Sequence, residues 1–69
     1  MKFKEFVKNC NQLLKDIPES SEFDVIYSTD EEGNSFYGVY YTPTIGVFDD
    51  YIFDNGEEYI GKENAVCIN

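Results

Sequence analysis

The chain has 69 residues, a formal charge of −9 at neutral pH and no histidine. We expect one domain over residues 1–69, because a chain this short has no room for a second core. The acidity opposes direct binding to nucleic acid and to anionic membrane surfaces. The absence of histidine removes the commonest general base and the imidazole metal ligands.

We expect a cytoplasmic location, because no apolar run is long enough to span a bilayer or to serve as a secretory signal. In that compartment Cys10 and Cys67 are expected to be reduced, and a disulfide between them is the alternative.

The charge is distributed unevenly along the chain. Residues 1–15 hold four lysines against one glutamate, a balance of +3, whereas residues 16–69 hold thirteen acidic residues against Lys62, a balance of −12. Such an acidic body favours a basic protein partner, because complementary fields accelerate encounter and select against wrong partners. The alternative is that the acidity serves only solubility.

The first expected element is an amphipathic helix over residues 2–16. Its apolar residues recur at helical spacing on one face, namely Phe3, Phe6, Val7, Cys10, Leu13, Leu14 and Ile17. Pro18 ends the helix, and no side chain suited to capping precedes its start.

Strands are expected over residues 23–29, 35–42, 47–54, 57–60 and 65–68. Residues 30–34 form an acidic turn between the first two strands, Pro43 and Gly46 interrupt the chain, and Asn55-Gly56 is typical of a tight hairpin turn. The fold class is therefore α+β, with one N-terminal amphipathic helix packed on an antiparallel meander of four to five short strands.

No residue set for catalysis is evident, and we expect a protein that is not an enzyme. Asp49 and Asp50 are adjacent in an expected strand, so their side chains point to opposite faces. Aligning Gly33 with the glycine of a calcium loop places Val39 where the bidentate glutamate belongs. We therefore expect a solvated hairpin tip with Gly33 or Asn34 at positive φ, with no metal and no cofactor.

One helix covers only one face of a sheet, so part of the tyrosine-rich strands should remain exposed beside carboxylates. Half-exposed tyrosines suit a protein interface. The expected partner-binding residues combine these two kinds of side chain: Asp30, Glu31, Glu32, Tyr37, Tyr40, Tyr41, Asp49, Asp50, Asp54, Glu57 and Glu58.

The segment from about Leu13 to Phe48 resembles small uncharacterised acidic proteins of tailed bacteriophages. The resemblance lies in a strand followed by D-x-E-G-N-x-[FY], here Asp30, Glu32, Gly33, Asn34 and Phe36, preceded by Pro18 and Glu19. It implies a phage accessory protein made in the cytoplasm of a bacterial host, and it implies no activity.

Three functions remain open from the sequence. The leading hypothesis is a non-enzymatic inhibitor or modulator that binds a basic, nucleic-acid-binding bacterial protein by imitating the charge of DNA. A nuclease, a CRISPR effector and a component of the transcription machinery are examples of such a partner. The second hypothesis is a homodimeric assembly module that uses its aromatic sheet face. The third is a sponge for a small signalling nucleotide, in which Lys2, Lys4 and Lys8 pair across a dimer.

Overall fold

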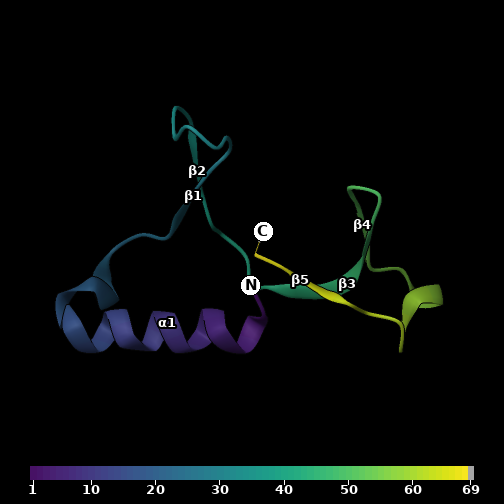
Figure 1. The fold of residues 1–69 in the computed structure, drawn as a ribbon, viewed down its shortest axis with the longest axis horizontal. Helices are drawn as coiled ribbons and strands as arrows, with labels where there is room; N and C mark the ends of the chain where they lie inside the picture. Colours follow the sequence, from purple (N-terminus) through teal and green to yellow (C-terminus); the bar gives the residue numbers. More distant parts are fainter. Residues whose placement is uncertain (69) are drawn as a thin grey trace. The chain divides into compact units, whose positions relative to one another are not determined.

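The computed structural model describes residues 1–68, and the chain divides into two compact units, Met1–Gly38 and Val39–Asn69. The first unit holds helix α1 (Phe3–Asp16), the 3-10 helix η1 (Pro18–Glu22) and strands β1 (Ile26–Ser28) and β2 (Phe36–Gly38). The second holds β3 (Thr44–Asp49), β4 (Ile52–Asp54), the 3-10 helix η2 (Glu57–Tyr59) and β5 (Ala65–Cys67) (Figure 1). One N-terminal helix and antiparallel strands in two sheets confirm the α+β class.

Helix α1 matches the sequence prediction to within a residue. Lys2 is its N-cap and provides no side-chain hydrogen bond, as expected from the sequence. At the other end the N–H of Ile17 donates to the carbonyl of Leu13 at 2.8 Å, and Pro18 begins η1. Within residues 1–68, no helix has both the length and the apolar character needed to cross a membrane.

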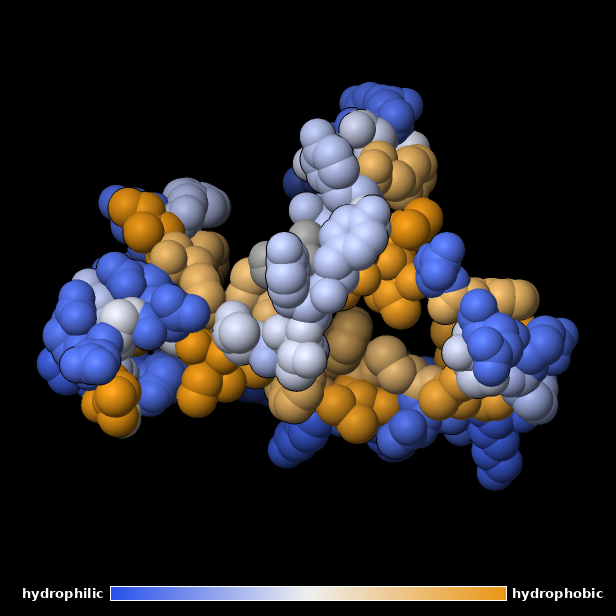
Figure 2. All heavy atoms as spheres, turned by 180° about the vertical axis from the view of Figure 1, so that it is seen from behind, coloured by the Kyte–Doolittle hydropathy of each residue, from blue (hydrophilic) through white to orange (hydrophobic). Residues whose placement is uncertain are grey.

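The apolar stripe of α1 remains largely accessible. Phe6 is 40% exposed, Leu14 44% and Leu13 52%. Figure 2 likewise shows hydrophobic side chains on the visible surface beside hydrophilic ones. No hydrophobic side chain among the described residues is fully buried. The stripe is therefore a largely accessible apolar surface.

The first sheet is a short hairpin of β1 and β2. Its register pairs Ile26 with Gly38, Tyr27 with Tyr37 and Ser28 with Phe36. The strands expected over 23–29 and 35–42 are thus too long. β2 ends at Gly38, so residues 39–42 of the expected strand lie outside it.

The second sheet has the order β4-β3-β5, so the last strand pairs with β3 rather than with its neighbour in sequence. Thr44 pairs with Cys67, Ile45 with Val66 and Gly46 with Ala65. The expected break at Gly46 is wrong: this residue lies within β3 and is buried. The strands form two sheets, whereas the sequence suggested one meander.

The strand expected over 47–54 is interrupted by a turn at Asp50 and Tyr51, which separates β3 from β4. Asp49 pairs with Ile52, and both intervening residues have positive φ, 50° and 62°. Two residues at positive φ are characteristic of the tight type I′ hairpin turn.

The hairpin turn expected at Asn55-Gly56 is also wrong, as is the strand expected over 57–60. Gly56 has φ −65°, and its N–H donates to Oδ1 of Asp54 at 3.1 Å. This side-chain hydrogen bond leads the chain into η2 in place of a returning strand. The strand expected over 65–68 is present as β5, which ends at Cys67.

Candidate partner-binding surface

All of the partner-binding residues expected from the sequence are exposed, but they belong to two units. Those of the first unit are Asp30, Glu31, Glu32 and Tyr37. Those of the second unit are Tyr40, Tyr41, Asp49, Asp50, Asp54, Glu57 and Glu58. The structure therefore presents two acidic and aromatic surfaces, and each has its own geometry.

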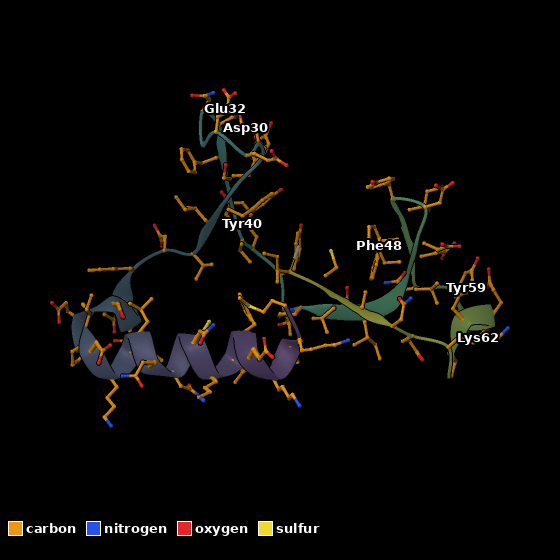
Figure 3. All side chains as sticks on the ribbon, viewed as in Figure 1. Asp30, Glu32, Tyr40, Phe48, Tyr59 and Lys62 are labelled. Carbon is orange, nitrogen blue, oxygen red and sulfur yellow. The ribbon has the colours of Figure 1, made fainter. Side chains whose placement is uncertain are left out.

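The tip of the β1–β2 hairpin is organised by its own acidic side chains. Oδ1 of Asp30 accepts a hydrogen bond from the N–H of Asn34 at 2.9 Å, and Oε2 of Glu32 accepts one from Nδ2 of Asn34 at 3.0 Å (Figure 3). Gly33 has φ 72°, as the sequence predicted for this residue or its neighbour. Asp30 and Glu32 thus stabilise the turn as well as carrying charge.

Behind this tip, two tyrosines face each other across the hairpin. The ring centroids of Tyr27 and Tyr37 are 6.1 Å apart at an interplanar angle of 44°. Tyr37 remains 61% exposed. Cross-strand aromatic pairs of this kind stabilise a short hairpin while leaving part of each ring free for contact.

Among residues 1–68, no group of three or more histidine, cysteine or acidic residues is arranged to hold a metal ion. Both cysteines are free thiols; Cys10 is exposed and Cys67 is half-buried.

In the second unit the most prominent feature is the tip of the β3–β4 hairpin. Tyr51 is 93% exposed, and it follows the two exposed carboxylates Asp49 and Asp50. The Tyr51 ring meets the Phe48 ring edge-on, with centroids 6.4 Å apart. Ile52, on the far side of the turn, is 66% exposed. The tip therefore combines two carboxylates with a cluster of accessible apolar side chains.

Tyr51 was missing from the residues expected to bind a partner. The two central residues of this turn, Asp50 and Tyr51, are neither glycine nor asparagine, which are the strongest local signals for positive φ. The β-branched and aromatic residues over 47–54 instead predicted one continuous strand, in which Tyr51 would be an ordinary side chain on one face of a sheet.

The other acidic residues of this unit serve partly in local structure. Oδ1 of Asp54 accepts the Gly56 N–H, and Glu57 and Glu58 lie in the first turn of η2. Figure 3 places Tyr59 and Lys62 on and beside this 3-10 helix. Negative side chains at the start of a helix are favourable, since backbone N–H groups point toward them.

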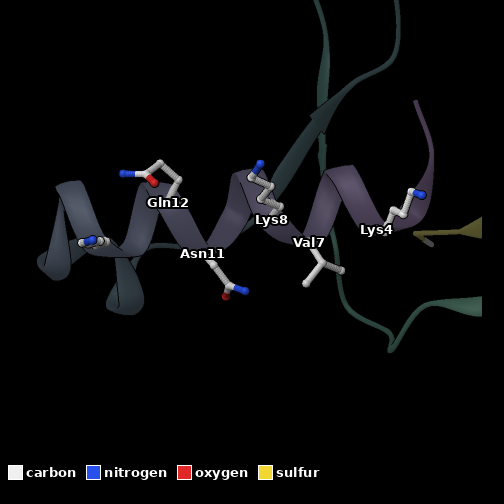
Figure 4. Close-up of a pocket in the computed structure, with 6 residues that line it drawn as sticks. Lys4, Val7, Lys8, Asn11 and Gln12 are labelled. Atoms are coloured by element: carbon white, nitrogen blue, oxygen red, sulfur yellow. The ribbon is translucent and has the colours of Figure 1, made fainter.

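A different kind of surface lies on α1. Three lysines and the apolar Val7 surround an open depression along the helix, which is lined by Lys4, Val7, Lys8, Asn11, Gln12 and Lys15 (Figure 4). Three of the five lysines of the chain thus lie along one side of this helix.

Comparison with known proteins finds no matching family model, no matching curated protein and no matching solved structure. The resemblance to bacteriophage accessory proteins stays a prediction.

Proposed function

We propose that this chain binds a basic macromolecular partner through the tip of the β3–β4 hairpin and does so without catalysis. The observation that carries the proposal is the combination of a 93% exposed Tyr51 with the adjoining carboxylates of Asp49 and Asp50. Exposed aromatic side chains anchor protein interfaces, and neighbouring charges select the partner.

The charge of the second unit supports a basic partner. Residues 39–69 carry six acidic residues against Lys62, a balance of −5. A field of one sign raises the rate of encounter with a surface of the opposite sign, and salt weakens this effect. The proposed partner is a protein that binds nucleic acid, since such proteins present the basic surfaces that an acidic chain can occupy in place of DNA.

We further propose that this partner is a protein in the cytoplasm of a bacterial host, as the resemblance of residues 13–48 to phage proteins would imply. A nuclease, a CRISPR effector or a transcription component would then be inhibited or modulated stoichiometrically. The first unit contributes a second acidic surface, formed by Asp30, Glu31, Glu32 and Tyr37.

The test begins with capture on the immobilised full chain from a bacterial lysate, with quantitative mass spectrometry of the retained proteins. Asp49→Lys is the informative variant, and Asp24→Lys is its matched control, because it makes the same change in charge at an exposed residue of the other unit. We expect a basic nucleic-acid-binding protein that the parent and the Asp24→Lys variant retain and that the Asp49→Lys variant retains less.

Binding kinetics with the purified captured protein then separate the two contributions. We expect Asp49→Lys to slow association, and we expect Tyr51→Gly and Tyr41→Ala to speed dissociation, because charges steer encounter while aromatic anchors hold the complex. Association should also fall between about 50 and 500 mM salt, where the Debye length shrinks severalfold. Capture that is identical for the parent and Asp49→Lys, or association insensitive to salt, contradicts the proposal.

A further inference from the structure

The apolar stripe of α1 follows the spacing of a helix that packs against another helix. Phe3, Phe6, Cys10, Leu13 and Ile17 alternate at intervals of three and four residues. This alternation is the repeat that keeps an apolar seam directed at a partner helix over successive turns. Val7 and Leu14 widen the seam on one side, as expected for a broad apolar face.

This seam is accessible in the structure. The exposed fraction is 50% for Phe3, 40% for Phe6, 52% for Leu13 and 41% for Ile17, and Cys10 is also exposed. Apolar surface of this extent on one helix is characteristic of an interaction site.

The charges along α1 and η1 indicate which partner fits the seam. Residues 1–8 carry three lysines and one glutamate, a balance of +2, whereas residues 15–22 carry one lysine and three acidic residues, a balance of −2. Two copies of this segment laid antiparallel bring each positive end against a negative end. A parallel pair would bring like charges together at both ends. The segment is thus electrostatically complementary to itself in one orientation only.

The apolar residues are compatible with the same orientation. When two copies of α1 are antiparallel and centred between residues 11 and 12, Cys10 of one copy lies level with Leu13 of the other. In the same register Phe6 lies level with Ile17. A two-fold axis relates the two halves of such an interface, so one register satisfies both copies. In an antiparallel pair, the positive N-terminal end of each helix dipole also lies beside the negative C-terminal end of the other, which is favourable.

We propose that α1 and η1 form an antiparallel dimer interface with a second copy of this chain. The occupant of the apolar seam is then the same seam of the second copy. Lys8 and Lys15, which line part of the basic depression, stay outside the dimer, because they lie on the opposite side of the helix from the seam. This inference is independent of the proposed partner of the β3–β4 hairpin.

The first test is sedimentation equilibrium of the full chain from micromolar to millimolar concentration. We expect a concentration-dependent species of twice the monomer mass. Leu13→Asp should weaken the dimer at least about tenfold, since it places a charge in the middle of the seam. Ile60→Asp is the matched control, because Ile60 is 74% exposed and lies in the second unit. Far-ultraviolet circular dichroism of both variants establishes whether α1 is still folded.

The second test reverses the charges at the ends of the segment. Lys2→Glu with Lys4→Glu should weaken the dimer roughly tenfold, and Glu19→Lys with Glu22→Lys should do the same. The combination of all four changes restores opposite charges at both ends and should recover the affinity of the parent. Glu57→Lys with Glu58→Lys in η2 is the control for the reversal in η1, since it alters two acidic residues of another 3-10 helix.

Recovery of dimer affinity in the fourfold variant would indicate antiparallel pairing. If the four residues only stabilised the fold of each copy, the losses of affinity from the two double variants would instead add. A chain that stays monomeric throughout the concentration range overturns the proposal. A dimer that Leu13→Asp and the charge reversals leave unchanged also overturns it, and places the self-association on another surface such as the aromatic strands.

Discussion

Gly46 lies against the aromatic ring of Phe53, which is on the neighbouring strand β4. A Cβ at residue 46 would be 2.6 Å from Cζ of Phe53 and 2.7 Å from the backbone oxygen of Asp54. Both distances are shorter than van der Waals contact, so β3 and β4 can approach as they do only because residue 46 has no side chain.

Gly46→Ala is therefore expected to destabilise the second unit by about 1–3 kcal/mol, the usual cost of overpacking. Urea unfolding followed by circular dichroism measures the change. Adding Phe53→Leu should recover only part of the loss, because the Asp54 oxygen belongs to the backbone and cannot move aside. Unchanged stability of the single variant would show that the strands separate without cost.

In the same sheet, the side chain of Asn64 forms hydrogen bonds with the backbone of β3. Oδ1 of Asn64 accepts the N–H of Phe48 at 2.7 Å, and Nδ2 donates to the carbonyl of Phe48 at 3.2 Å. Asn64 immediately precedes β5, so its amide extends the pairing of β3 beyond the start of that strand.

Asn64→Ala removes both of these hydrogen bonds and should cost about 1–2 kcal/mol, a modest sum because Asn64 is exposed. Asn64→Asp keeps the acceptor for Phe48 but sets a carboxylate against its carbonyl, so it should also destabilise. Hydrogen exchange of the Phe48 amide is the direct measurement. Equal protection in the parent and the alanine variant would exclude this role.

Tyr51 is in a backbone conformation that side chains disfavour, with φ 62°. For residues other than glycine the left-handed region costs roughly 1–2 kcal/mol, and β-branched residues fit it worst. The Phe48–Tyr51 ring contact offsets little of this strain, because the Tyr51 ring is almost fully exposed.

Tyr51→Gly should therefore leave the stability equal or raise it by up to about 1 kcal/mol, after allowing for the flexibility of glycine in the unfolded chain. Tyr51→Val should lower the stability. Thermal melts of the two variants under the same conditions make the comparison. A shift in the same direction for both would mean that side-chain contacts, rather than φ, decide the stability of this turn.

We expect the tip of the β1–β2 hairpin to depend on a hydrogen-bond acceptor at residue 30 rather than on its charge. Asp30→Asn keeps Oδ1 as an acceptor for the Asn34 N–H, whereas Asp30→Ala removes it. We expect a loss of about 1 kcal/mol for the alanine variant only.

Changing Asp30 to Asn together with Glu31 and Glu32 to Gln should leave stability equal or slightly higher, because mutual repulsion of the carboxylates decreases. Denaturation midpoints at low salt report this difference best. Calcium added to the parent should leave its melting temperature unchanged, since the tip lacks the bidentate ligand of a calcium loop. A calcium-dependent rise that the triple variant lacks would instead indicate a metal site.

Sequence patterns were most reliable where the determining contacts are close in the chain. The 3.6-residue period of the apolar positions and Pro18 predicted α1 to within a residue. Gly33, which follows three carboxylates and precedes Asn34, predicted the β1–β2 turn, and it takes the positive φ. The exposure of the expected carboxylates also follows from composition, since unpaired carboxylates on a small chain stay in water.

The second unit depended on contacts distant in sequence. Asn55-Gly56 is a stronger local turn signal than Asp50-Tyr51, yet the hairpin forms at the latter. The pairing of Asp49 with Ile52 brings Phe53 against Gly46. A local sequence pattern does not predict this contact between strands. Asp54 meanwhile holds Gly56 at φ −65° and directs the chain into η2.

The sequence by itself determined the amphipathic helix, the acidic hairpin tip, the α+β class and the separation of positive from negative charge, because these depend on neighbouring residues and on composition. Only the tertiary structure decided the strand order β4-β3-β5, the burial of Gly46 and the projection of Tyr51 from a strained turn. The physical reason is that strand pairing joins residues far apart in the chain. The register of the strands depends on how side chains pack across the sheet, and this packing outweighs the local turn and strand propensities of the sequence.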